Sequence, residues 1–182
     1  ELFQKYNMEY SVINQYPFML SGGMTRRVFI CSALMETPKL VIADEPTPGL
    51  HKEMAQKVVS HFREMADMGA GVLMITHDLE LAISTADKII VLYNGEIMEV
   101  TKAENFKSEH TLYHYYTKAL WKAMPKNGFQ NIPIQQTNRK GCPFVQYCPK
   151  SKQQCTTDEI PYFKKEESII KCLFVGGEKQ CY

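Results

Sequence analysis

Leu40-Val41-Ile42-Ala43-Asp44-Glu45 is an apolar run of strand length that ends in two adjacent carboxylates. A continuous apolar run predicts a parallel strand that is covered on both of its faces. Two carboxylates at the end of such a strand cannot both turn into the core. One of them can hold Mg²⁺ through water while the other orients and deprotonates an attacking water molecule. The competing interpretation is a solvated Asp-Glu-Pro turn without chemistry.

Helices and strands are predicted to alternate around this run. Residues 23–36 have a helical repeat whose buried face carries Val28, Cys31 and Met35. Residues 51–68 carry a second helical stripe, which consists of Met54, Val58, Phe62 and Met65. Residues 71–76 then form another buried strand, and residues 79–86 a short helix. This order predicts an α/β fold with parallel strands whose carboxyl ends meet a ligand.

The two ends of the chain differ in character from this middle part. Residues 1–16 predict a short amphipathic helix and a loop, and residues 88–100 a hairpin about Asn94-Gly95, which suits a type I′ turn. After about residue 105 there is one aromatic-rich helix within 110–124, and then an irregular stretch rich in Pro, Gln, Lys and Cys. We therefore predict two domains, residues 1–105 and 106–182, with a boundary near 105–125.

Ser21-Gly22-Gly23 has the composition of a phosphate-binding helix start, with Ser21 as the N-cap. The free N–H groups and the dipole of a helix N-terminus attract a phosphate, and glycines let it approach closely. Arg26 and Arg27 lie in the first turns, where cations disfavour the helix, so a nearby anion would explain them. The alternative is a plain serine cap after a Gly-Gly loop.

His77 follows the second predicted strand as Asp44 and Glu45 follow the first. If the two strands are neighbours, the imidazole lies beside Glu45 at one edge of the sheet and can hydrogen-bond a terminal phosphate. A lone histidine after a strand is more often structural, so this prediction depends on its pairing with Glu45.

Composition excludes several classes of protein. The chain has 182 residues, 45% of them hydrophobic, which is enough for one domain with a core, or a domain and an appendage. A formal charge of +1 gives no argument for nucleic acid or for an anionic membrane surface. No apolar stretch approaches the roughly 20 residues of a membrane span. No secretory signal opens the chain, so its six cysteines are expected as thiols or metal ligands.

Together these residues resemble the nucleotide-binding subunit of ABC transporters. Leu20–Met24 is similar to the signature motif of that family, and Leu40–Glu45 to its Walker B strand. Pro48–His51 occupies the position of the D-loop of that family, and His77 occupies the position of its switch histidine. The D-loop of the family usually ends in Leu-Asp, whereas this one ends in Leu50-His51. Residues 114–120 and the later cysteines are similar to the branch that imports oligopeptides, dipeptides or nickel.

The resemblance implies ATP hydrolysis with Mg²⁺ in a head-to-tail pair of ATPase subunits. Residues 21–23 would contact the γ-phosphate of an ATP held by the partner subunit. Asp44 would serve Mg²⁺ through water, Glu45 would be the general base, and His77 would contact the γ-phosphate. Further implied partners are transmembrane permease subunits and, indirectly, an extracytoplasmic solute-binding protein. The implied location is peripheral, on the cytoplasmic face of the cell membrane, with no nucleic acid bound.

The phosphate loop of such ATPases has no counterpart here. No G-x-x-x-x-G-K-[ST] sequence occurs in the 182 residues, and the adenine-stacking aromatic and the Q-loop are missing as well. We therefore expect a truncated or fragmentary form that neither binds ATP tightly nor hydrolyses it alone.

Four cysteines, Cys142, Cys148, Cys155 and Cys172, follow one another in the last part of the chain. Four thiolates can close a zinc site or hold a [4Fe–4S] cluster. The spacing lacks C-x₂-C hooks, which favours the cluster, and related importer ATPases carry one there. The alternative is four reduced surface thiols. Cys31 is expected in the core, and Cys181 has no evident role.

Two other functions remain open at this point. One is a soluble, non-transport ABC ATPase of DNA repair or translation, against which the importer-type tail argues. The other is a catalytically inactive metal-binding or interaction fragment. An upstream reading frame that contains a phosphate loop would separate the ATPase from that fragment.

Overall fold

The computed structural model describes residues 2–35, 38–131, 140–176 and 178–180. The chain forms two compact units, Glu1–His77 and Asp78–Tyr182, and each of them is described by itself. The predicted boundary near residue 105 rests on a change of composition, and it stays a prediction.

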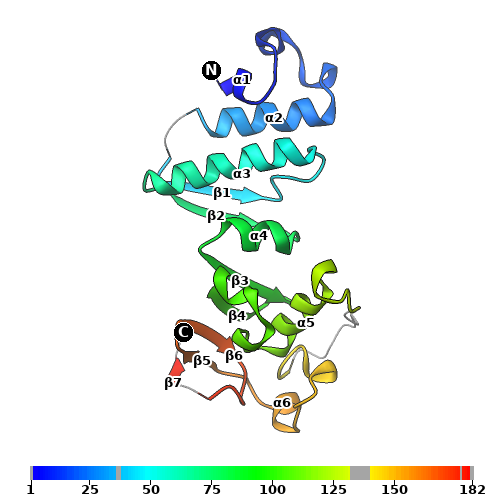
Figure 1. Cartoon of the computed structure of the whole chain (residues 1–182), viewed down its shortest axis with the longest axis vertical. Helices are drawn as coiled ribbons and strands as arrows, with labels where there is room; N and C mark the ends of the chain where they lie inside the picture. Colours follow the sequence, from blue (N-terminus) through cyan, green and yellow to red (C-terminus); the bar gives the residue numbers. More distant parts are fainter. Residues whose placement is uncertain (1, 36–37, 132–139, 177, 181–182) are drawn as a thin grey trace. The chain divides into compact units, whose positions relative to one another are not determined.

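The first unit consists of a two-stranded parallel sheet and the helices beside it. In chain order its elements are α1 (Leu2–Lys5), two 3₁₀ turns (Tyr10–Asn14 and Pro17–Met19), α2 (Gly22–Ala33), β1 (Leu40–Asp44), α3 (Lys52–Asp67) and β2 (Gly71–Ile75). The sheet aligns Leu40 with Gly71 at one end and Asp44 with Ile75 at the other. Helices α2 and α3 lie on the same side of this sheet (Figure 1). The carboxyl ends of both strands therefore reach one edge, as predicted.

The core of this unit forms between α3, α2 and β1. The predicted stripe of α3 is confirmed, because Val58, Phe62 and Met65 are buried and Met54 packs against them. Cys31 of α2 and Ala43 of β1 belong to the same cluster, as do Tyr6, Met8 and Leu34. Helix α3 ends where Gly69 takes a positive φ of 99°, which suits a helix C-terminus.

Two predictions about burial in this unit are wrong. Met35 is 70% exposed, because α2 ends at Ala33 and the chain buries Leu34 at its C-cap instead. The strands are not covered on both faces, since Ile42 and Leu73 are 64% and 46% exposed. The reason is that α2 and α3 pack on one face of the sheet. Residue 36, the predicted end of the helix, lies outside the described residues.

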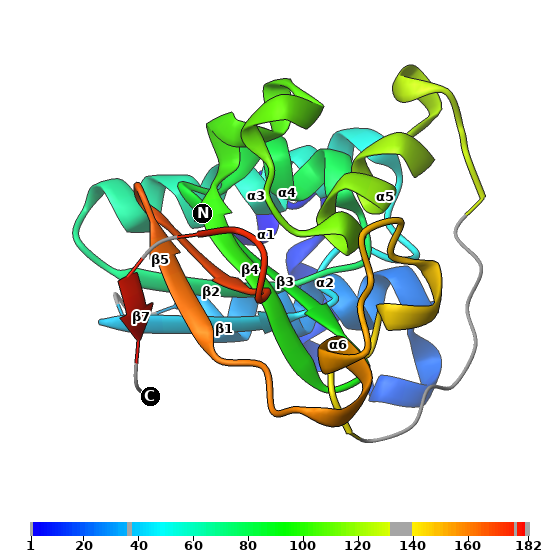
Figure 2. The same ribbon diagram turned by 90° about the horizontal axis from the view of Figure 1, so that it is seen from below.

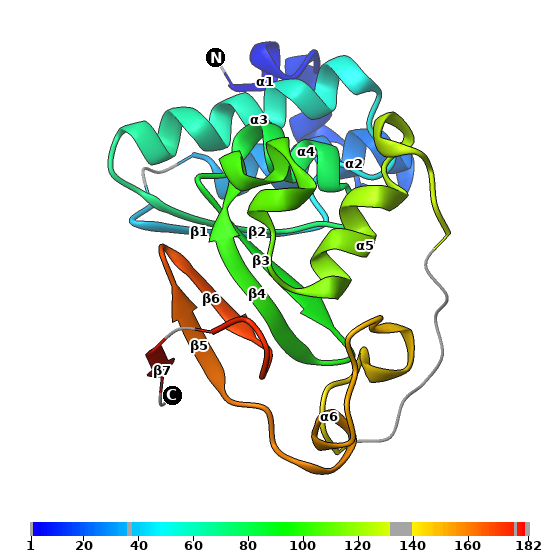
Figure 3. The ribbon, with the colours of Figure 1, turned by 60° about the horizontal axis from the view of Figure 1, so that its bottom comes forward.

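The second unit is built on an antiparallel sheet of strand order β3-β4-β6-β5-β7. Its helices and strands are α4 (Leu79–Thr85), β3 (Lys88–Tyr93), β4 (Glu96–Lys102), α5 (Tyr115–Ala123), α6 (Gln154–Thr157), β5 (Tyr162–Lys165), β6 (Ser168–Lys171) and β7 (Glu178–Gln180). Short 3₁₀ turns cover Ala103–Lys107, Glu109–Thr111, Pro125–Asn127 and Val145–Tyr147. Figure 2 shows the long β3–β4 hairpin, and Figure 3 shows α5 beside it.

The predicted hairpin is confirmed, together with its turn. Asn94 and Gly95 have φ angles of 50° and 79°, as a type I′ turn requires. Buried side chains of both strands, such as Val91 and Met98, pack with Phe106 and Leu112 into one core. The β5–β6 hairpin was not predicted, although Tyr162-Phe163 and Ile169-Ile170 are residue types that favour strands.

No helix of the described segments is both long and apolar enough to cross a bilayer.

Replacing Phe62 by alanine tests the core of the first unit. We expect the free energy of unfolding to fall by about 3–5 kcal/mol, because a large buried side chain leaves a cavity. Urea denaturation measures the change. Gln56→Ala, on the exposed side of the same helix, should change stability by no more than about 0.5 kcal/mol. Equal effects of the two substitutions would contradict the described packing.

Candidate functional site

The ends of β1 and β2 bring Glu45 and His77 into direct contact. The Glu45 Oε1 atom accepts a hydrogen bond from the backbone N–H of His77 at 3.0 Å, and it lies 2.9 Å from His77 Nδ1. A carboxylate can only accept, so Nδ1 donates whenever Glu45 is ionised. The imidazole is largely exposed, whereas a third of the Glu45 side chain is exposed. The predicted pairing at one sheet edge is thus present.

The second carboxylate oxygen of Glu45 has a different environment. Oε2 is buried and has no hydrogen-bond partner within the part of the chain that the structure describes. A buried acceptor without a partner is costly, and such atoms concentrate at functional sites. This oxygen is therefore an acceptor of Glu45 that none of the described groups uses.

The backbone of Glu45 is also unusual. Its φ is +46°, in the left-handed region that costs a residue other than glycine about 1–2 kcal/mol. Its N–H donates to the carbonyl of Ile75 at 2.9 Å, which extends the pairing of β1 with β2 by one residue. The Arg26 guanidinium donates to the carbonyl of Glu45 and, at 2.7 Å, to that of Pro48. A side chain of α2 thus fixes the turn that carries Glu45.

Ser21 caps α2 as predicted, because its Oγ accepts the N–H of Met24 at 3.3 Å. Ser21 and Gly22 are exposed, so the start of the helix is accessible. Gly23 lies beside the loop after Glu45, since a Cβ at that position would come within 4.0 Å of the Gly49 carbonyl oxygen. The helix start, the acidic strand end and the imidazole therefore belong to one region of this unit.

The expectation that an anion would explain Arg26 and Arg27 needs correction. Arg26 binds the two carbonyls named above, and Arg27 donates to the carbonyls of Gly23, Tyr6 and Asn7. Backbone oxygens already bind both guanidinium groups, so a bound anion is not needed to explain these two arginines.

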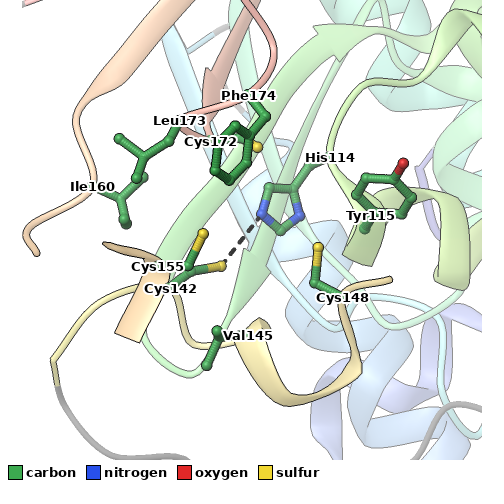
Figure 4. A pocket seen from close by; sticks show the side chains of 10 residues that line it. All are labelled: His114, Tyr115, Cys142, Val145, Cys148, Cys155, Ile160, Cys172, Leu173 and Phe174. Carbon is green, nitrogen blue, oxygen red and sulfur yellow. Dashed lines mark hydrogen bonds between the residues drawn. The ribbon is translucent and has the colours of Figure 1, made fainter. Parts of the chain in front are cut away.

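The second unit holds a small pocket that contains all four cysteines predicted as ligands (Figure 4). Its walls are formed by His114, Tyr115, Cys142, Val145, Cys148, Cys155, Ile160, Cys172, Leu173 and Phe174. All four cysteines are free thiols. Four separate elements deliver them: the loop before the Val145–Tyr147 turn, the end of that turn, α6, and the residue after β6. Cys181 lies outside the described residues.

Gly141 joins two of these elements. Its φ is +80°, and a Cβ there would collide with the backbone carbonyl of Cys155. The same carbonyl accepts the N–H of Cys142 at 2.8 Å. Glycine is therefore required at this position to hold Cys142 against Cys155.

The thiols are buried and receive backbone donors. Burial raises the pKa of Cys142 to about 11, and it also raises the pKa of Cys148 and Cys172. Backbone hydrogen bonds from Phe144, Lys150 and Phe174 to these sulfurs act in the opposite direction. These amide donors favour the thiolate form, but burial is the larger effect, so the pKa of each of the three thiols is raised overall.

The pocket does not form a site for one ion. Across the residues that the structure describes, no three His, Cys, Asp or Glu side chains approach closely enough to hold a single metal ion. Zinc needs its ligands within about 2.0–2.3 Å of one point. A [4Fe–4S] cluster gives each thiolate its own iron, so its ligands stand farther apart. What the described pocket supplies is four thiols, the number of ligands that a [4Fe–4S] cluster takes.

Sequence reasoning missed two residues at these sites. Arg26 is one, because nothing in its position along α2 shows that it reaches the carbonyls of Glu45 and Pro48. His114 is the other, which is 3% exposed and lies 3.8 Å through Nε2 from Cys142 Sγ. His114 lies inside the range 110–124 predicted for an aromatic-rich helix, so nothing marked it as an N-cap, and its contact with Cys142 spans 28 residues of chain.

Two segments of the chain match known families. Residues 1–48 match the ABC transporter family, and residues 98–155 match the C-terminal region of oligopeptide/dipeptide transporters. The second segment includes Cys142, Cys148 and Cys155 and ends before Cys172.

Several curated proteins are similar over most of this chain. The oligopeptide transport ATP-binding protein AppD of Bacillus subtilis is 33% identical over 92% of this chain and 54% of its own length. The dipeptide transport ATP-binding protein DppD of Escherichia coli is 31% identical over 94% of this chain and 53% of its own length. The chain thus spans about half the length of these relatives.

Solved structures agree with these matches. A structure of the ATP-binding subunit of an ABC transporter is 27% identical, with a TM-score of 0.57 over 66% of this chain and 50% of that one. The ATP-binding cassette MJ0796, a dimer bound to ADP and phosphate, is 30% identical, with a TM-score of 0.51 over 56% of this chain and 44% of that one. These neighbours confirm the predicted α/β fold with parallel strands, as part of the P-loop NTPase fold of ABC ATPase domains.

Substituting Arg26 by leucine tests how the Glu45 turn is held. We expect a loss of about 1–3 kcal/mol in stability, because two charge-assisted hydrogen bonds disappear. Amide hydrogen exchange should quicken at Glu45 and Leu50, whose N–H groups donate to the carbonyls of Ile75 and Thr47.

Arg27→Leu is the matched control on the same helix. It removes bonds to Gly23, Tyr6 and Asn7, so stability should fall while exchange at Glu45 and Leu50 stays unchanged. Slow exchange at those two amides in the Arg26 variant would contradict the positioning role.

Proposed function

Because the chain belongs to the ATP-binding subunits of ABC transporters, in the oligopeptide/dipeptide branch, we propose that it is the C-terminal part of an ATPase that drives peptide import. The observation that carries this proposal is the Glu45–His77 contact at the shared end of β1 and β2. The chain itself has no phosphate loop, so that loop would come from a further region of the longer protein or from a partner subunit.

Glu45 would be the general base that activates the attacking water. Its Oε1 accepts from His77, while its buried Oε2, which has no partner among the described residues, would accept the proton of that water once the assembled site admits the water. The left-handed backbone at Glu45, tied by Arg26, keeps the carboxylate at the strand end. A base held in this way loses little entropy on reaching the transition state.

His77 would connect the base to the terminal phosphate. One ring nitrogen is committed to Glu45, which leaves Nε2 for the nucleotide. The ring is exposed, so a phosphate can reach it without displacement of other side chains. Contact of His77 with both groups would make the position of Glu45 depend on the bound nucleotide.

Asp44 would complete the nucleotide site of Glu45 and His77, whereas residues 21–23 would belong to the nucleotide site of the partner subunit. Asp44 is an exposed carboxylate at the end of β1, which suits Mg²⁺ held through water. Bound Mg²⁺ would neutralise charge on the phosphates. The accessible N-terminus of α2 at Ser21–Gly23 would contact an ATP that a partner ATPase subunit holds.

The cargo and the assembly follow from the same relatives. The named relatives transport oligopeptides or dipeptides, so short peptides are the proposed cargo, with nickel as the alternative within the predicted branch. The proposed partners are a second ATPase subunit, transmembrane permease subunits and, indirectly, a solute-binding protein. The proposed location is peripheral, on the cytoplasmic face of the membrane. These 182 residues alone would not hydrolyse ATP.

We further propose that the second unit carries a [4Fe–4S] cluster in its cysteine pocket. The specific observation is that Cys142, Cys148, Cys155 and Cys172 line one pocket although 30 positions separate the first from the last. These four thiolates would hold the cluster, which supplies one-electron redox chemistry and a covalent link between four elements. Four reduced thiols without metal are the alternative.

Glu45→Gln tests the catalytic proposal in the full-length subunit assembled with its partners. Glutamine keeps the size of the side chain but cannot take a proton, so ATP turnover should fall by about 10²–10⁴-fold. Nucleotide binding should persist, because Glu45 does not bind the nucleotide in this proposal. Phosphate release and equilibrium binding measure the two effects.

Glu64→Gln provides the control, since Glu64 lies on the exposed surface of α3 and pairs with Lys5. Its turnover should match the wild type. An unchanged turnover in Glu45→Gln would remove Glu45 as the base.

Cys148→Ser tests the cluster in the present chain after anaerobic reconstitution. We expect loss of bound iron, of labile sulfide and of the visible absorbance of the cluster, since one of its four thiolates is removed. Cys31→Ser is the control, because Cys31 is buried in the core of the first unit. A wild-type chain without iron after reconstitution would refute the cluster.

A further inference from the structure

One polar side chain in the cysteine pocket is not used by the proposed ligand set. His114 is the N-cap of α5, is 3% exposed and lines the pocket beside the four cysteines. Its Nδ1 accepts the backbone N–H of Tyr116 at 3.0 Å, and its Nε2 lies 3.8 Å from Cys142 Sγ (Figure 4).

These two contacts fix the tautomer of the ring. A backbone N–H can only donate, so Nδ1 must be the unprotonated nitrogen of the neutral imidazole. The ring proton then resides on Nε2, which is the atom that meets Cys142. The contact is therefore an N–H donor directed at a sulfur, and a protonated nitrogen cannot itself bind a metal.

The position of His114 is fixed from its backbone side as well. Its N–H donates to Glu99 Oε2 at 2.8 Å, and the preceding N–H of Tyr113 donates to Glu99 Oε1 at 3.1 Å. Glu99 is fully buried on β4, where it pairs with Ile170 of β6, two residues before Cys172. Glu99 thus connects the strand that leads to Cys172, through its backbone, with the start of the helix that presents His114, through its carboxylate.

Among the three cysteines with backbone donors, Cys142 also has this side-chain donor. Its sulfur receives the N–H of Phe144, and Nε2–H of His114 approaches it from another element. Hydrogen bonds to ligand sulfurs are among the factors that set the potential of an iron–sulfur cluster. They stabilise the reduced state more, because reduction places additional negative charge on the cluster and its sulfurs.

We infer that His114 is a positioning residue that raises the reduction potential of the cluster through an Nε2–H···Sγ hydrogen bond to Cys142. This inference rests on the proposed cluster. Reduction adds one electron to the cluster, breaks no bond and moves no proton, so His114 keeps its Nε2 proton in both states. An electrode supplies that electron in the test below.

The test compares wild type, His114→Asn, His114→Phe and Tyr115→Phe in the present chain after anaerobic reconstitution. Asparagine is a favoured N-cap and still accepts the Tyr116 N–H, but its shorter side chain ends before Cys142. Phenylalanine keeps the pocket closed to water but removes both nitrogens. Tyr115→Phe changes another residue of the pocket wall and leaves the Cys142 contact in place.

Potentiometric titration should show a lower midpoint potential in both His114 variants. The expected change is about tenfold in the redox equilibrium, or about 59 mV for a one-electron couple. Tyr115→Phe should match the wild type. Unchanged potentials in both His114 variants, with the cluster present, would overturn this inference and leave the cluster proposal intact.

A second measurement does not depend on the cluster. Nitrogen-15 NMR of the metal-free chain should show His114 protonated at Nε2 and unprotonated at Nδ1. A proton on Nδ1 would overturn the inference. This result would count even if the His114 variants fail to hold a cluster. A wild-type chain that takes up no cluster overturns the cluster proposal first, and this inference with it.

Discussion

The parallel pairing of β1 with β2 is the constraint on which the candidate catalytic site depends. Asp44 and Ile75 are partners at the last position of the ladder, so both strands end at the same level. Glu45 is the first residue after β1 and His77 the second residue after β2, and they are consequently close enough for Glu45 Oε1 to contact the backbone N–H and Nδ1 of His77. A shift of the register by one residue would turn the side chains to the other face of the sheet and separate the pair.

The sequence was sufficient to predict this part of the molecule because the signals are local and periodic. The apolar run before Asp44, the helical stripe of α3 and the Asn94-Gly95 turn each depend on residues within one element or one turn. Strand ends then follow from strand lengths, and the convergence of Glu45 and His77 follows from parallel strands that are neighbours. The same reasoning failed to predict which strand residues are buried, since it gives no information on which face of a sheet the helices pack against. Ile42 and Leu73 are exposed for that reason.

Contacts between elements that are distant along the chain could not be predicted from the sequence. The bond from Arg26 to the carbonyl of Glu45 crosses 19 positions, and the approach of His114 to Cys142 crosses 28. Neither has a periodicity that a pattern could detect. The cysteines are an intermediate case, because their number and spacing predicted a shared site but not the elements that deliver them. Gly141 shows the difference, since its need to be glycine arises from the carbonyl of Cys155, 14 residues later.

The two sites differ in what holds them together, and this has a consequence for folding. The Glu45–His77 site stands on a sheet and two helices that bury a shared core. Residues 140–161 instead consist of a short 3₁₀ turn, a four-residue helix and loops, closed by contacts such as the bond from Cys142 to Cys155. A segment with so little regular structure buries few apolar groups. The free energy gained by that burial has to offset the conformational entropy that is lost when the segment becomes ordered. A metal group bound only by the folded form adds its binding free energy to folding. The proposed cluster would therefore stabilise this segment whether or not the cluster changes its oxidation state. A structural role and a redox role of the cluster are thus separable. The hydrogen bond from His114 affects only the redox role.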